Sequence, residues 1–232
     1  MEMKMLLFSV LLWNAGRCEV RDLSGKQFSF PNDPKGVNLP HVVLHAKTTS
    51  ISTMTICLRF FSQLKRMQGL FSLATRVHEN SLMLNKDGQG SYKVHVGSDS
   101  YSYLQLPTNH LDWNSVCWTW DSQTGLTQLW LNGLRTSQKL VGMNHIVRGD
   151  VSIIIGQEQD EFQGGFKTND SFEGDMTDLH MWDHVVSACD IRSYMNQGSF
   201  DPGNVLNWNN LNYTVSGNVF TQDADFVEPV CQ

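Results

Sequence analysis

The chain has 232 residues, of which 17 are basic and 23 acidic, so its formal net charge is −6. Hydrophobic residues make up 41% and charged residues 17%, a composition that excludes a disordered chain and is typical of a folded one. The acidic balance argues against nucleic-acid specificity and against binding to anionic membranes, because both need clustered Lys and Arg. The five cysteines are an odd number, which any redox interpretation has to explain.

Residues 1–18 are expected to be a signal peptide. Met5–Trp13 is an apolar run behind Lys4, shorter than the ~20 residues that span a bilayer but typical of a secretory signal. Small residues follow this run, so cleavage is expected before Glu19; a buried N-terminal strand is the alternative. No other apolar stretch reaches membrane length. The sequence therefore predicts a secreted, extracellular domain, 19–232, with no transmembrane segment and an even number of cysteines.

Two of these cysteines fall in strand patterns with the same parity. Alternate residues of Met54–Phe60 are apolar, which leaves Cys57 on the other face, and Cys117 is placed likewise in Val116–Trp120. Cysteines of equal parity can meet across paired or neighbouring strands, where a bridge would contribute about 4 kcal/mol in the chain-entropy model. Free buried thiols are the alternative, and export disfavours it.

The remaining chain is expected to consist mainly of short strands and turns. Asn132 and Gly133 form a strong hairpin signal, because both tolerate positive φ. One helix is expected, capped at its start by Ser187 with Asp190 three residues later, and stopped by Gly198. Further β-prone runs are Gly69–Ala74, Ser91–Val96, Tyr101–Leu106, Gln128–Leu131 and Val151–Ile155. Many short strands with one helix predict an all-β protein, a β-sandwich or jelly roll, in one domain.

Oxygen-bearing side chains are concentrated in Gly156–Gly165, directly after an apolar strand. Glu158, Asp160 and Glu161 alternate with Gln residues and precede two glycines, and Asp170 follows farther on. Calcium takes about six to eight oxygen ligands, and a glycine-rich loop lets them converge. A solvated acidic loop is the alternative, since the spacing is not that of an EF-hand.

From Phe28–Pro31 to Gly217–Thr221 the chain resembles the pentraxin family. Cys117–Ser122 fits the family signature His-x-Cys-x-Ser/Thr-Trp-x-Ser/Thr, with Ser115 where the His is expected. Further matching blocks are Gly156–Asp160, Met181–Asp183 and Val205–Trp208. The resemblance implies a flattened β jelly roll, a concanavalin-like sandwich, with one short helix on one face and a double calcium site on the other. Its disulfide cysteines correspond to Cys57 and Cys117.

The resemblance also implies the metal ligands. The first calcium ion would be bound by Glu79, Asn80, Glu158, the backbone carbonyl of Gln159, and Asp160. The second would share Glu158 and Asp160 and add Asp170. Lys167 stands where the family has a Glu, and its positive charge repels a metal ion. We therefore expect one tight calcium site and a second one weakened by Lys167.

By the same resemblance, the protein is expected to be a homopentamer that binds phosphate-bearing or carbohydrate ligands through its calcium. Its expected role is in innate immunity and the acute phase, with complement components as the partners that the family implies. Asn85 and Ser100 stand near where the family places a Phe and a Glu against a choline group. Phosphoethanolamine, acidic saccharides and galactose-type sugars are therefore as plausible as phosphocholine. A structural lectin of an extracellular coat or matrix, without an immune role, is the alternative.

An enzyme is not expected. Jelly-roll glycosidases carry Glu-x-Asp-x-x-Glu, and Glu158–Gln163 fits that pattern until Gln163, which cannot transfer a proton.

Two modifications stay open. Asn169 and Asn212 begin Asn-x-Ser/Thr sequons that permit glycosylation. Cys189 and Cys231 can pair with each other, bridge subunits or stay free.

Overall fold

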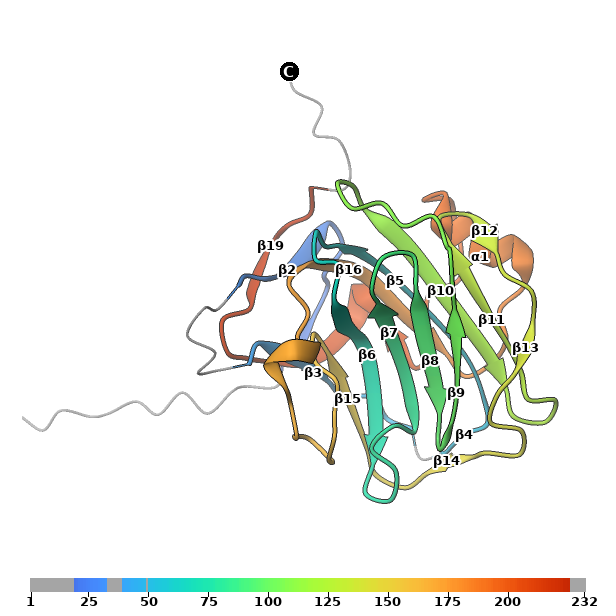
Figure 1. Ribbon diagram of the computed structural model, residues 1–232. Coiled ribbons are helices and arrows are strands. Elements are labelled where there is room, and N and C mark those ends of the chain that lie inside the picture. The colour runs from blue at the N-terminus through green and yellow to red at the C-terminus, as the bar shows by residue number, and fades with distance from the viewer. Residues whose placement is uncertain (1–18, 33–38, 49, 226–232) are drawn as a thin grey trace, which may run out of the picture.

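The computed structural model describes residues 19–32, 39–48 and 50–225, and in it two antiparallel sheets pack face to face (Figure 1). The first sheet has eight strands in the order β1 (Glu19–Arg21), β18 (Leu211–Ser216), β3 (His41–Leu44), β15 (Val151–Ile155), β6 (Met67–Thr75), β7 (Leu82–Asp87), β8 (Tyr92–Val96) and β9 (Asp99–Tyr103). The all-β sandwich expected from the sequence is confirmed.

The second sheet has nine strands. Its main path runs β12 (Leu134–Arg135), β11 (Leu126–Leu131), β10 (Asn114–Asp121), β5 (Thr53–Phe61), β16 (Gly174–Trp182), β2 (Lys26–Phe30) and β19 (Phe220–Asp223). The short strands β13 (Lys139–Leu140) and β17 (Leu206–Asn207) pair with β11 and β16, and a separate ladder joins β4 (Ser50–Ile51) to β14 (Val147–Arg148). The helical elements are α1 (Ala188–Met195) and two single 3₁₀ turns, η1 (Thr168–Asp170) and η2 (Trp208–Asn210).

The core lies between the two sheets and follows the alternation read from the sequence. Met54, Ile56, Leu58 and Phe60 of β5 point inward together with Val116, Trp118 and Trp120 of β10, and none of them is exposed. Side chains on one face of a strand recur at every second residue, so the intervening residues of β5 and β10 point out of the sandwich.

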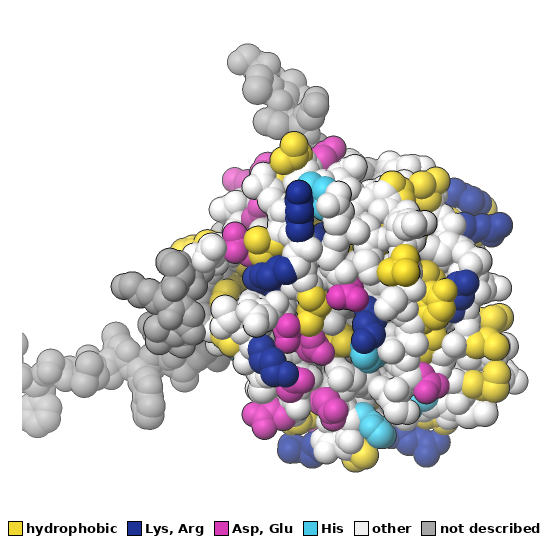
Figure 2. Space-filling model, in the orientation of Figure 1, with side chains coloured by type: hydrophobic (Ala, Val, Ile, Leu, Met, Phe, Trp, Pro, Cys, Tyr) yellow, Lys and Arg dark blue, Asp and Glu magenta, His cyan; other side chains and the backbone are white. Residues whose placement is uncertain are grey.

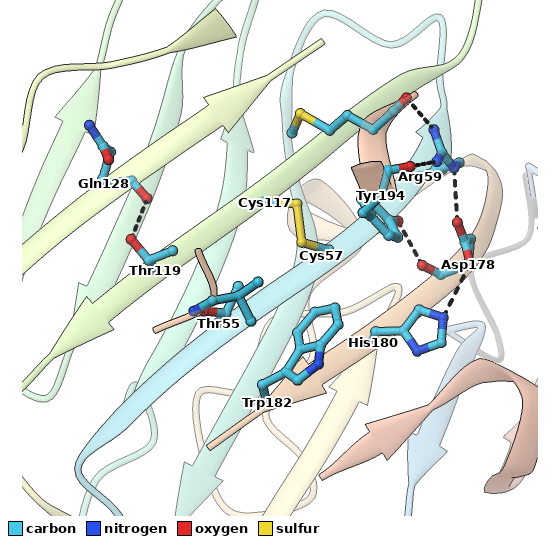
Figure 3. Close-up of a disulfide and its surroundings, with 12 residues drawn as sticks. Thr55, Cys57, Arg59, Cys117, Thr119, Gln128, Asp178, His180, Trp182 and Tyr194 are labelled. Carbon is cyan, nitrogen blue, oxygen red and sulfur yellow. Dashed lines mark hydrogen bonds and ion pairs between the residues drawn. A yellow bond between two sulfur atoms is a disulfide. The ribbon is translucent and has the colours of Figure 1, made fainter. Parts of the chain in front are cut away.

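Those outward positions include the two cysteines, which lie directly opposite each other in the β5–β10 ladder. Cys57 and Cys117 form a disulfide with a Cα–Cα distance of 4.1 Å, as predicted. The disulfide belongs to a second apolar cluster with Trp130, Trp182 and Ile191 of α1. Figure 3 shows it between the strands that carry Cys57 and Cys117. The helix therefore covers the outer face of the nine-stranded sheet.

A buried ion pair fastens the end of α1 to this sheet (Figure 3). Arg59 of β5 donates to the carbonyls of Tyr194 and Met195, and its Nε lies 3.0 Å from Oδ2 of Asp178. Nε2 of His180 lies 3.2 Å from the other oxygen of Asp178. Carbonyls at a helix C-terminus lack intrahelical partners. Arg59 supplies a donor to the Met195 carbonyl and a second donor to the Tyr194 carbonyl, which also accepts from the backbone N–H of Gln197.

Local signals in the sequence also held. Oγ of Ser187 accepts from the backbone N–H of Asp190, which caps α1 as expected. Asn132 and Gly133 both have positive φ in the turn between β11 and β12. After this turn the chain forms two short strands, β12 and β13, that both pair with β11. Within the described ranges, no helix is long and apolar enough to cross a membrane.

Replacing Asp178 by Asn should destabilise the protein by about 3 kcal/mol at neutral pH, because the Arg59 side chain, only 6% exposed, would lose its counter-charge. Burial acts to raise the pKa of Asp178, but the hydrogen bond from His180 and the charge of Arg59 outweigh it and hold that pKa below the usual 3.8. The carboxylate's contribution is therefore present above pH 3.8 and is lost as the pH falls through the lowered value.

The measurement is urea unfolding across this pH range. Asp183→Asn is the matched control, because Asp183 also forms a hydrogen bond with a histidine, His184, but its side chain is 57% exposed. Equal losses in the two variants would contradict a structural role for the buried pair.

Candidate metal centre

The acidic loop Gly156–Gly165 leaves β15 and crosses the outer face of the eight-stranded sheet, opposite the face that α1 covers. It passes so close to β6 that a Cβ on Gly69 would lie 2.7 Å from the backbone carbon of Gln157 and 2.8 Å from the backbone nitrogen of Glu158. Only glycine allows this approach, so Gly69 sets how near the loop lies to the sheet.

Two glutamines fix the loop from below, and neither has any exposed surface. The Gln159 amide donates to the carbonyls of Ser72 and Ser152, while its oxygen accepts from the backbone of Gln163 at 3.0 Å. The Gln157 amide donates to Ser171 at 2.8 Å and to the Pro40 carbonyl. With the glutamines pointing inward, the intervening Glu158 and the following Asp160 are left on the outer side.

The carboxylates predicted as ligands come together around one lysine. Nζ of Lys167 lies 2.7 Å from Oδ2 of Asp160. Asp170, at the end of η1, is close enough to Glu158 to raise the pKa of Glu158, and Asp160 is close enough to Asp170 to raise the pKa of Asp170. Arg66 holds η1 in place by donating to the carbonyls of Asn169 and Ser171 at 3.1 and 2.7 Å.

Electrostatics within this group disfavour its negative charge when no cation is bound. Burial is the largest influence that raises the pKa of Glu158, followed by the nearby carboxylates of Asp170 and Asp160. Burial likewise raises the pKa of Asp170, although Lys167 acts in the opposite direction. Like charges held together and partly removed from water are the condition that a bound cation relieves.

Asn85 of β7 is an additional member of this group. Its Nδ2 donates to Oε2 of Glu158 at 3.4 Å, while its Oδ1 is buried with no hydrogen-bond partner. The sequence placed Asn85 near the ligand pocket, but its contact with Glu158 depends on a loop and a strand 73 residues apart.

The remaining predicted ligands, Glu79 and Asn80, lie in the turn between β6 and β7. Arg76 of the same turn stacks its guanidinium 4.5 Å from the ring centre of Phe162, which brings the turn beside the acidic loop. Among the residues that the structure describes, no hydrogen bond or ion pair joins Glu79 or Asn80 to the carboxylates around Lys167. Oδ1 of Asn80 is nevertheless buried without a partner, as expected of an amide oxygen whose partner would be a cation.

The residues present have the oxygen chemistry that a calcium site needs. Within the described ranges there is no group of three or more His, Cys, Asp or Glu side chains able to hold a metal by themselves. Amide and carbonyl oxygens would have to complete the coordination, which suits calcium. The buried Asn80 oxygen without a hydrogen-bond partner is one such oxygen, and Lys167 pairs with Asp160, which both expected ions would share.

Three further expectations concern covalent chemistry. Asn169 is exposed on η1, so its side chain is accessible to glycosylation, whereas Asn212 is only partly exposed within β18. Cys189 is an exposed free thiol on α1. Cys231 and the predicted signal segment 1–18 lie outside the described residues.

Replacing Glu158 by Gln should stabilise the metal-free protein slightly at pH 7, by up to about 1 kcal/mol after allowance for solvent screening. A raised carboxyl pKa means that ionisation opposes folding, so removing the charge removes that cost. The advantage should disappear as the pH falls towards the ordinary Glu value of about 4.5, where the native side chain is protonated too. Thermal unfolding in a chelating buffer measures it.

Glu161→Gln in the same loop is the control, since Glu161 is exposed. A lower melting temperature for Glu158→Gln than for this control in the chelating buffer would show that the negative charge of Glu158 does not destabilise the metal-free protein.

Figure 2 shows acidic side chains gathered on this face of the molecule with basic and histidine side chains beside them.

The Pentaxin family model matches residues 26–223. C-reactive protein of Sus scrofa is 35% identical over 202 residues, covering 87% of this chain and 88% of that protein. Serum amyloid P-component of Mus musculus is 33% identical over 218 residues, covering 93% of each.

Among solved structures, a native heptameric SAP-like pentraxin from Limulus polyphemus has a similar fold. It aligns with a TM-score of 0.82 at 22% identity, covering 90% of this chain and 99% of that one. The family match spans the disulfide, the acidic loop and α1. The chain belongs to the pentraxin family.

Proposed function

We propose that the protein is a secreted, calcium-dependent, lectin-like binding protein of innate pattern recognition rather than an enzyme. One observation carries the proposal: buried Gln157 and Gln159 hold Glu158 and Asp160 on the outer face of the sheet. Sequence similarity to C-reactive protein and serum amyloid P-component supports a calcium-dependent binding role for that face.

In the proposed site, calcium would be bound by Glu79, Asn80, Glu158, the backbone carbonyl of Gln159, and Asp160. A bound calcium ion supplies coordination positions for oxygen atoms of phosphate-bearing or carbohydrate ligands. Gln159 can present its carbonyl because its side chain is held inside by Ser72 and Ser152. Asn85 orients Glu158 through its amide, as hydrogen-bonding neighbours of metal ligands commonly do.

Assembly and secretion belong to the same proposal. We expect a cyclic homopentamer, in which sites on one face turn weak single contacts into avid binding. The Limulus relative is described as heptameric, so subunit number needs direct measurement. The Cys57–Cys117 disulfide fits export after removal of residues 1–18. Complement components are the partners that family membership favours.

The test is retention of the secreted protein on phosphocholine, phosphoethanolamine and galactose resins in calcium, followed by elution with chelator. We expect retention on at least one resin and complete release by chelator. Retention that chelator does not affect would refute the calcium mechanism. Recovery from an insoluble matrix rather than from circulating fluid would favour the structural-lectin alternative over pattern recognition.

Lys167 should set the calcium stoichiometry, so we expect one tight ion per chain and a much weaker second. Lys167→Glu replaces the ammonium next to Asp160 with a further oxygen ligand and should strengthen the second site about tenfold or more. Calorimetric titration measures both ions. Lys47→Glu, at an exposed position after β3, controls for net charge. Two equally tight ions in the native protein would refute a role for Lys167.

A further inference from the structure

A cavity of about 380 Å³ lies beside the first turn of α1, on the outer face of the nine-stranded sheet. Cys57 of β5 and Trp182 of β16 line it from the sheet. Ser187 and Asp190 line it from the start of the helix, and part of the segment 200–204 completes it. Small-molecule sites commonly have volumes of about 300–1,000 Å³. The cavity is therefore large enough for a ligand with one ring or a short chain.

Aromatic rings form much of the cavity wall. Trp182 and Tyr194 are 3% and 1% exposed, and the ring centre of Phe200 lies 6.3 Å from that of Trp182 and 5.2 Å from that of Tyr194. Nε1 of Trp182 donates to the backbone carbonyl of Asp201 at 3.0 Å, so the indole is already oriented without a ligand. This wall offers a hydrophobic body a preformed surface on which to be buried.

Two carboxylates also line the cavity, those of Asp190 and Asp201. Oδ2 of Asp190 accepts from Oγ of Ser187 at 2.7 Å, whereas the Asp201 carboxylate has no hydrogen bond or ion pair within the described residues. Among the described residues that line the cavity, none is Lys or Arg. His184 lines it too, but its Nδ1 lies 3.0 Å from Oδ1 of Asp183, which balances the positive charge of the imidazole when it is protonated.

The nearest cations are engaged elsewhere. Arg59 stacks 4.7 Å from the ring centre of Tyr194, but its charge is paired with Asp178. The guanidinium of Arg192 lies 5.9 Å from the ring centre of Trp130, which does not line the cavity. The N-terminus of a helix carries about half a positive charge, less than two carboxylates supply. The cavity therefore has an excess of negative charge that favours a cationic ligand.

We propose that this cavity binds a small organic cation, an amine with an apolar body. The ammonium group lies at Asp190 and Asp201, and the apolar body packs against Trp182 and Phe200. Aromatic faces attract a cation as well as an apolar group, so the same wall serves both parts of the ligand. The proposed calcium ligands belong to the other side of the sandwich, so binding here does not need calcium.

The experiment is calorimetric titration of the full secreted protein with 2-phenylethylamine, 2-phenylethanol and 3-phenylpropionate. These three compounds share a ring and a short chain and differ in charge, which is positive, zero and negative. We expect the amine to bind about tenfold more tightly than the alcohol, and the acid to bind more weakly than either. Added salt should reduce the advantage of the amine and leave the alcohol unchanged, because salt screens charge.

Asp201→Asn removes one carboxylate at almost constant size, so it should weaken binding of the amine about threefold or more and leave that of the alcohol unchanged. Asp150→Asn is the matched control, because it makes the same change at a 75% exposed side chain before β15, in the other sheet, and should alter neither. Val186→Phe places a larger side chain at the cavity wall and should abolish binding of both compounds. If Val186→Phe does not fold, the comparison of the two Asp variants decides.

The outcomes separate this proposal from the calcium mechanism. Equal affinities for the amine and the alcohol, or equal losses in the Asp201 and Asp150 variants, would overturn the amine site. Amine binding that chelator abolishes would also overturn it, since that ligand would then belong to the acidic loop. Equal amine affinity in calcium and in chelator supports the proposal. Retention on the calcium-dependent resins should be the same for Asp201→Asn as for the native protein, so failure of the amine site leaves the proposed function standing.

Discussion

The candidate site depends on the burial of two glutamine amides between the acidic loop and the sheet. Gln157 and Gln159 reach Pro40, Ser171, Ser72 and Ser152, so the loop is tied to four separate parts of the chain. Burying an amide costs free energy unless its donors and its acceptor form hydrogen bonds, and both glutamine amides form them. The loop therefore has little freedom to let its carboxylates separate, although their mutual repulsion favours it. Neutral hydrogen bonds therefore keep these carboxylates close together.

Lys167 relieves part of that repulsion, but its contribution is limited. Its ion pair with Asp160 joins side chains that are 62% and 36% exposed, and exposed pairs of this kind contribute about 1 kcal/mol at most. Lys167 also lowers the pKa of Glu158, yet burial and the neighbouring carboxylates still keep that pKa raised. One tethered ammonium thus leaves part of the negative charge uncompensated.

The alternation of apolar residues and the local capping signal predicted the features that depend only on nearby residues. The alternation around Cys57 and Cys117 placed both on the outer face of the sheet, and the cap at Ser187 marked the start of the helix that covers them. The order of strands could not be obtained this way, because β5 lies between β10 and β16, which are far from it in the chain. The contact of Asn85 with Glu158 and the bond from Arg59 to Asp178 could not be found either, since each joins residues more than 70 positions apart. The Gln-Glu-Gln alternation was visible, but which of its members point inward is decided by the close passage over Gly69.

The two faces of the sandwich can change independently, and this follows from where each is anchored. The helix is fastened to the nine-stranded sheet by Arg59 and the disulfide cluster, whereas the acidic loop is fastened to the eight-stranded sheet through Ser72 and Ser152. A close-packed core separates them, so substitutions confined to outward positions of one sheet leave the other face intact. Lys93, His95 and Ser100 occupy such positions, outside the core cluster. Substitutions at these residues can therefore change the surface of the eight-stranded sheet at little cost in stability, while the acidic loop stays fixed by its buried amides.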